Sequence, residues 1–155
     1  MGIRVDGRDT LTQTIPAGAL GATNGKIAFY WTPRHGGGDM EKFGSVNPVA
    51  GLAYKNATNF IRLLSVDNNR MRISVNIGGV NTDGADWTPA GALVAGTKYL
   101  VELEYNSVAF TFSIDGAVVD TATPVAGIDF GANIPDTFYA GSNQTGVSTG
   151  DAVFS

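Results

Sequence analysis

The sequence predicts an all-β protein, an antiparallel β-sandwich. Apolar residues recur with a period of two in several runs, and this period separates the two faces of a strand. Glycine occurs 21 times and, together with Asn and Asp, separates the runs. The runs lie roughly 8–12 residues apart, a spacing typical of sandwiches and barrels. A helical period appears only around residues 59–64, where flanking asparagines favour a strand.

Four runs in the first half of the chain are predicted strands. Segment 26–33 (KIAFYWTP) is rich in aromatic and β-branched residues and ends at a proline; 49–54 (VAGLAY) and 59–66 (NFIRLLSV) follow. Segment 70–77 (RMRISVNI) alternates cleanly. One of its faces carries Met71, Ile73, Val75 and Ile77, and the other Arg70, Arg72, Ser74 and Asn76. We expect 59–66 and 70–77 to pair as a hairpin.

The second half continues the pattern. Segment 98–105 (KYLVELEY) should pair with 109–114 through a turn at Asn106-Ser107. Asp115-Gly116 then predicts a two-residue turn of type I′, because both of its central residues need a positive φ, which glycine accepts and aspartate tolerates. The last predicted strands are 136–141 (DTFYAG) and 151–154 (DAVF).

Length and composition bound the class of protein. A chain of 155 residues suits one domain, 1–155, with residues 1–10 as an N-terminal arm. The net charge of −4 argues against nucleic acid and anionic membranes as partners. The absence of cysteine and the single histidine exclude disulfides, thiolate zinc sites and multi-histidine metal sites, so no cofactor is expected on these grounds. The sequence has no signal-peptide pattern at its start and no apolar run long enough to span a bilayer.

The longest irregular segments, 34–48 and 78–97, are the predicted functional loops, since rim loops commonly carry binding sites. Trp87 lies among Gly and Asp, and an exposed indole there would stack on the C–H face of a sugar. The alternative is that Trp87 plugs one end of the core. The predicted ligand-binding residues are Trp87, Asp83, Asp86, His35 and Asp39.

The order of several motifs resembles the concanavalin A-like, laminin-G-type jelly-roll family. An early strand has the pattern Phe-x-Trp-x-Pro (Phe29 to Pro33), and a late hairpin has Ser113-Ile114-Asp115-Gly116. Ala140-Gly141 follows, and the last run is Asp151 to Ser155. The resemblance implies two curved antiparallel sheets packed face to face, with ligands at a concave face or at rim loops. Family members normally continue past the last motif, so we expect a short final strand, a strand completed by a neighbouring chain, or a chain that is a portion of something longer.

The resemblance also implies a calcium ion at a rim, held by Asp, Asn and backbone oxygens. The metal-ligand candidates are Asp67, Asn68 and Asn69, which form one turn. Asp and Asn are also the commonest turn residues for conformational reasons, so turn chemistry alone is the competing explanation.

Glu102 and Glu104 are the residues to consider for catalysis. They point to the same side of a strand, with Cβ atoms about 6–7 Å apart, and glycosidases use paired carboxylates at similar separations. Glycanases of the resembled fold carry a denser acidic motif, which this chain lacks. We therefore expect no enzyme, and expect ion pairs with Lys98 or the Arg70/Arg72 pair instead.

Three functional hypotheses follow, in decreasing order of support. The first is a non-catalytic binding or adhesion module, extracellular, that binds a glycan or surface polymer through rim loops. The second is a structural virion protein, such as a phage capsid decoration or tail-appendage subunit at the virion surface, with other virion proteins or copies of itself as partners. The absence of cysteine and the Ala-, Gly-, Thr- and Asn-rich strands favour it. The third is a glycan hydrolase.

Overall fold

A computed structural model describes residues 3–5, 11–33, 49–67, 70–89, 94–140 and 152–154. The described residues form strands joined by turns and contain no helix. They therefore include no helix that is long and apolar enough to cross a membrane. The strands are β1 (Ile3–Val5), β2 (Leu11–Thr14), β3 (Gly25–Pro33), β4 (Val49–Asn56), β5 (Asn59–Asp67), β6 (Arg70–Ile77), β7 (Val80–Trp87), β8 (Tyr99–Tyr105), β9 (Phe110–Ile114), β10 (Ala117–Ala122), β11 (Thr137–Ala140) and β12 (Ala152–Phe154).

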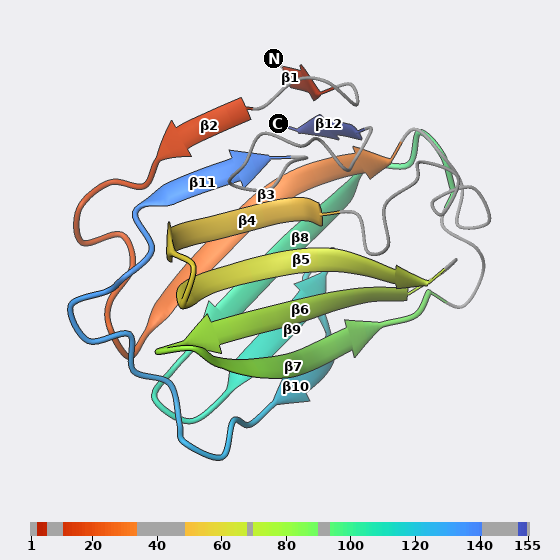
Figure 1. The fold of residues 1–155 in the computed structure, drawn as a ribbon. Helices are drawn as coiled ribbons and strands as arrows, with labels where there is room; N and C mark the ends of the chain where they lie inside the picture. Colours follow the sequence, from red (N-terminus) through yellow and green to blue (C-terminus); the bar gives the residue numbers. More distant parts are fainter. Residues whose placement is uncertain are drawn as a thin grey trace.

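The strands form two antiparallel sheets packed face to face (Figure 1). One sheet has the order β2-β11-β4-β5-β6-β7, and the other has the order β1-β12-β3-β8-β9-β10. We call them the front and rear sheets, after their places in Figure 1. Neighbours such as β11 and β4 are distant in sequence, as in a jelly roll, and the all-β sandwich prediction is confirmed.

The predicted hairpins are present. β5 pairs with β6, and β8 pairs with β9. The turn between β9 and β10 has φ of 51° at Asp115 and 80° at Gly116, the left-handed values that the Asp-Gly pair predicted. β11 and β12 lie within the predicted segments 136–141 and 151–154. β1 lies in the N-terminal arm and pairs with β12 at the edge of the rear sheet.

Alternation places the core between the sheets. On the front sheet Met71, Ile73 and Val75 are buried, as their period of two predicted. On the rear sheet Phe110 and Phe112 are fully buried. Trp31 also points inward, as expected from its position two residues after Phe29. The core is continuous across both sheets, so the described strands form one packed unit.

The prediction that 78–97 is a loop was wrong for its first half, which forms β7. Pairing with β6 places Arg72 opposite Asp86 and Ser74 opposite Asp83, so β7 contains an extra residue, a β-bulge. Gly84 lies in this bulge, and a Cβ there would come 3.0 Å from the carbonyl oxygen of Ile73. The sequence of β7 resembles that of a loop, because Asn, Asp and Gly have low strand propensity. The glycine is nevertheless required in this strand, because a side chain at position 84 would crowd the backbone of β6 at the bulge.

Candidate functional site

The outer face of the front sheet carries the most concentrated polar and aromatic chemistry that the structure describes. Register aligns Tyr54, Phe60 and Asn76 across β4, β5 and β6. The next row contains Arg62 and Ser74, and the row beyond contains Leu64, Arg72 and Asp86. Rows on one face are about 7 Å apart, so these side chains form a single surface.

Arg62 occupies the centre of this surface. Its guanidinium carbon lies 5.0 Å from the centre of the Phe60 ring, in cation–π range. Its Nε is buried and has no hydrogen-bond partner, and none of the described carboxylates forms an ion pair with Arg62. The Phe60 ring therefore orients the Arg62 guanidinium, and no described carboxylate neutralises the charge of this group.

Two half-buried tyrosine rings lie on the same face of the sheet as Arg62. Tyr54 and Tyr139 pack edge to face with centroids 6.1 Å apart, and both contact Leu64 together with Phe60. Leu64 points to the outer face yet is only 7% exposed. This small apolar cluster is separate from the main core, which lies on the other side of the sheet. It gives the outer face a place for an apolar or C–H surface of a ligand.

A bidentate ion pair borders the surface. Arg72 donates from Nε to Asp86 Oδ1 at 2.7 Å and from Nη2 to Asp86 Oδ2 at 2.9 Å, and Arg70 Nη1 lies 3.2 Å from the same Oδ2. The hydrogen bond from Arg72, with the charge of both arginines, holds the pKa of Asp86 below its usual value. Asp86 therefore remains a carboxylate at neutral pH, with its oxygens oriented by the two guanidinium groups.

Two of the predicted ligand-binding residues, Asp86 and Trp87, lie on opposite faces of β7. Asp86 lies on the outer face, whereas Trp87 points to the core side, partly buried and edge-to-face with Tyr99 at 5.4 Å. Asp83 belongs to β7, but its side chain is outside what the structure describes, as are His35 and Asp39. The observed packing of Trp87 is the plug arrangement that was its alternative.

Most of the predicted calcium ligands lie outside the described residues. Asp67 ends β5, and Asn68 and Asn69 lie outside the described residues. Within the described ranges, no group of three or more acidic or histidine side chains could hold a metal ion. Calcium binding at 67–69 stays a prediction.

Sequence reasoning missed Phe60, Arg62 and Tyr139 as site residues. The signal for two of them was available, since the hairpin of β5 with β6 and strict alternation place Phe60 and Arg62 on the same face of the sheet as Arg72. Tyr139 could not be placed in this way, because β11 joins β4 from more than eighty residues further along the chain and its neighbours were not predictable.

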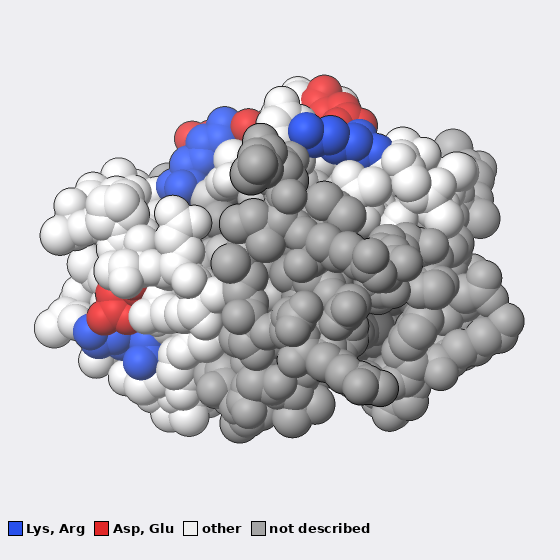
Figure 2. Space-filling model, turned by 90° about the horizontal axis from the view of Figure 1, so that it is seen from above, with Lys and Arg blue, Asp and Glu red and all other residues white. Residues whose placement is uncertain are grey.

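Glu102, on the outer face of the rear sheet, forms an ion pair with Lys26 at 2.7 Å. The expected partners of Glu102 were Lys98 or Arg70 and Arg72, and this expectation was wrong. The strand beside β8 is β3, and its Lys26 lies opposite Glu104 and diagonal to Glu102. On the face seen from above, the described charges occur as small groups of blue beside red, with no broad basic patch among them (Figure 2).

Comparison with known proteins finds similarity in structure alone. No family model matches the sequence, and no curated protein matches it. Domains LG4-5 of the mouse laminin alpha1 chain superpose with a TM-score of 0.64 and 17% identity, covering 99% of this chain and 40% of that one. Sheep galectin-11, solved in complex with glycerol, superposes with a TM-score of 0.54 and 7% identity, covering 97% of this chain and 96% of that one.

A third similar structure is domain 4 of AbnA, an extracellular arabinanase from Geobacillus stearothermophilus, solved in complex with arabinotriose. It gives a TM-score of 0.57 and 12% identity, covering 86% of this chain and 58% of that one. The chain thus spans less than half of the laminin chain that it matches. At these identities the comparisons establish the architecture, and the chain has the laminin-G-like form of the concanavalin A-like jelly-roll fold.

Proposed function

We propose that the protein is a non-catalytic carbohydrate-binding module that holds its glycan on the outer face of the front sheet. The observation that carries this proposal is Arg62, stacked on Phe60 at 5.0 Å and without a described carboxylate partner. A guanidinium donates to sugar hydroxyl or carboxylate oxygens, while the neighbouring rings accept the C–H face of a pyranose or furanose. Arg72 and Asp86 supply oriented donors and acceptors at the border.

The similar structures support this class of ligand. Domain 4 of the arabinanase was solved with arabinotriose bound, on a fold that this chain shares. That arabinanase is described as extracellular, and we propose the same setting here. The proposal moves the site from the rim loops expected from the sequence to the sheet face, and keeps Asp86 from the predicted set.

A glycan array followed by calorimetry tests the proposal. The array contains arabino-oligosaccharides, neutral hexose oligomers and uronate-containing oligomers, with and without calcium. Arg62→Ala should weaken binding to any positive glycan at least about tenfold, since the charged hydrogen bonds of one guanidinium are worth roughly 1.5–3 kcal/mol. Lys55→Ala is the matched control, because it also removes one cation but from an exposed pair with Asp136.

Two outcomes would overturn the proposal. One is an array that stays blank under both calcium conditions. The other is equal loss of binding in Arg62→Ala and Lys55→Ala. Arg62→Lys separates charge from geometry, since lysine keeps the cation but loses the planar group that stacks on Phe60. Binding that requires calcium would assign a role to the turn at 67–69.

Absence of catalysis is a separate part of the proposal. Glu102 is held by Lys26, so the Glu102/Glu104 pair is a surface ion-pair cluster. We expect no hydrolysis of arabinan or β-glucan in a reducing-sugar assay. Hydrolysis that disappears in Glu102→Gln would contradict this expectation, because it would identify a carboxylate of the pair as a catalytic group.

A further inference from the structure

Arg62 carries a half-buried guanidinium group that makes no hydrogen bond to the described residues. Its Nε is buried without a partner, and none of the described carboxylates forms an ion pair with it. Nη1 and Nη2 also lack a described partner, but they are not among the buried unpaired nitrogens, so they reach the surface. Buried donors are normally satisfied, so this partly desolvated cation with two accessible nitrogens is an incomplete site.

Arg72, on the next strand, shows how this face satisfies a guanidinium elsewhere. Its Nε and Nη2 donate to the two oxygens of Asp86 at 2.7 and 2.9 Å. The residues directly opposite Arg62 are Leu52 on β4 and Ser74 on β6, and neither is charged. The fold thus places a carboxylate against one arginine of this face and an apolar and a hydroxyl side chain beside the other.

The apolar neighbours of Arg62 strengthen its interaction with an anion. Phe60 and Leu64 lie two residues before and after it, on the same face of β5. The ring of Phe60 lies 5.0 Å from the guanidinium carbon, and Leu64 is buried. These side chains exclude water from part of the group without supplying a negative charge, and opposite charges attract more strongly where water is excluded.

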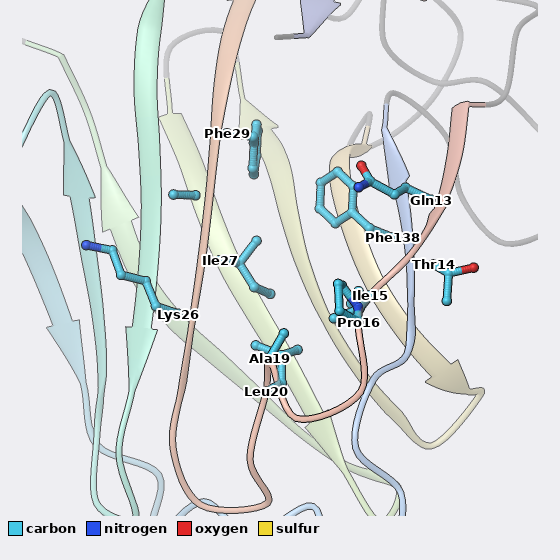
Figure 3. A pocket seen from close by; sticks show the side chains of 11 residues that line it. Gln13, Thr14, Ile15, Pro16, Ala19, Leu20, Lys26, Ile27, Phe29 and Phe138 are labelled. Carbon is cyan, nitrogen blue, oxygen red and sulfur yellow. The ribbon is translucent and has the colours of Figure 1, made fainter.

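The apolar cavity between the sheets is a different environment (Figure 3). Its volume is about 230 Å³, and Ile27, Phe29 and Phe138 are among its lining residues. Lys26 is its only charged lining residue, points away from the other side chains in Figure 3, and pairs with Glu102 at 2.7 Å. The cavity therefore offers an acidic sugar no unpaired cation, whereas the outer face of the front sheet does so at Arg62.

We propose that the sugar bound at Arg62 is a uronate, whose carboxylate is held by the guanidinium directly, without a metal ion. This inference rests on the proposed function, because it requires a glycan on this face. The two carboxylate oxygens accept hydrogen bonds from Nη1 and Nη2, in the paired geometry that a guanidinium and a carboxylate share. The C–H face of the sugar contacts the half-buried rings of Tyr54 and Tyr139.

A uronate completes the site in a way that a neutral sugar does not. A hydroxyl oxygen would accept a hydrogen bond from Arg62 but would leave the charge of the guanidinium without a counter-charge. Hydrogen bonds between two ionised groups are shorter and stronger than those with a neutral partner. The uronate carboxylate would therefore do for Arg62 what Asp86 does for Arg72.

Calorimetry with uronate trisaccharides tests this inference on the unaltered protein. The probes are trigalacturonate, triglucuronate and trimannuronate, each measured in EDTA beside its carboxyl-reduced counterpart. Reduction replaces every carboxylate by a hydroxymethyl group and leaves the sugar ring unchanged. At least one uronate should bind, and its reduced counterpart should bind at least about tenfold more weakly, because the charged hydrogen bonds to one guanidinium are lost.

Arg62→Gln assigns this difference to the arginine. The variant should lose affinity for the uronate at least about tenfold more than for the reduced counterpart, since the coupling belongs to the pair of guanidinium and carboxylate. Lys55→Gln is the matched control, because it removes the cation of an exposed pair with Asp136 and should change neither affinity.

Several results would overturn the inference and leave the proposed glycan site standing. They are equal affinity for a uronate and its reduced counterpart, and binding of arabinotriose without binding of any uronate. Tighter binding of a sulfated galactose trisaccharide would assign Arg62 to a sulfate instead. Uronate binding that EDTA abolishes and calcium restores would show that a metal ion holds the carboxylate. If no glycan binds, neutral or acidic, the proposed function fails and the inference fails with it.

Discussion

Tyr105 shows how one buried polar group ties the turn before β3 to the rear sheet. Its hydroxyl donates to the carbonyl oxygen of Gly21 at 2.8 Å, and its ring packs against Phe110 and Phe130. A Cβ on Gly25 would lie 2.7 Å from that hydroxyl oxygen, so glycine permits the close approach. Burial raises the pKa of Tyr105 to about 12.

This pKa predicts a loss of stability in alkali that depends on Tyr105. The unfolded chain ionises Tyr105 near its usual pKa of 10.0, whereas the folded chain keeps it neutral up to about pH 12. The stabilisation is therefore complete below pH 10 and is lost as the pH rises through 12. Between these limits the free energy of unfolding should fall by up to about 1.4 kcal/mol per pH unit more than in Tyr105→Phe.

Tyr105→Phe should also lower the free energy of unfolding by about 1 kcal/mol at neutral pH, since one buried hydrogen bond is removed. Urea denaturation of both proteins between pH 7 and 12 checks both effects. Parallel curves for the two proteins over the alkaline range would contradict the assignment of this titration to Tyr105.

At the scale of elements, Asp120 joins the two sheets along one side of the sandwich. β10 and β7 are edge strands of different sheets. Asp120 Oδ2 accepts a hydrogen bond from the Asp86 N–H at 2.7 Å, and a Cβ on Gly84 would lie 3.4 Å from the Cβ of Ala122. The Asp120 carboxylate therefore accepts a hydrogen bond from a backbone N–H at the edge of β7, and this bond links the two sheets along this side of the sandwich.

Asp120→Ala should destabilise the protein by about 1–3 kcal/mol, because the Asp86 N–H loses a charged acceptor. Asp120→Asn keeps an acceptor oxygen and should recover most of this loss. Amide exchange at Asp86 supplies a local measurement, and it should accelerate in the alanine variant more than exchange at the core strands. Equal stability of the alanine and asparagine variants would show that the contact does not close the side.

At the scale of the whole molecule, local pairing could be predicted from the sequence, whereas long-range neighbours could not. Alternation and turn chemistry predicted β3 to β6, β8, β9 and the Asp115-Gly116 turn, since those signals lie within a few residues. β7 was missed because its bulge requires Gly84 and its outward residues are polar. The Arg62 surface was missed because register across distant strands brings its parts together.

Phe112 in the rear sheet is fully packed, whereas Phe138 in the front sheet lies beside a cavity. Truncating each ring to alanine should therefore lower the free energy of unfolding by different amounts. Phe112 is fully buried in the rear sheet, and Phe112→Ala should cost about 3–5 kcal/mol through lost transfer energy and a new cavity. Phe138 is half-buried and already lines a cavity of about 230 Å³, with Phe29 at a centroid distance of 5.4 Å.

Because that existing space lies beside the ring, Phe138→Ala loses fewer contacts and should cost about 1–3 kcal/mol. Urea denaturation of the two variants measures both values, and unchanged m-values would confirm that the same surface unfolds. Equal costs would mean that the cavity beside Phe138 is closed in solution.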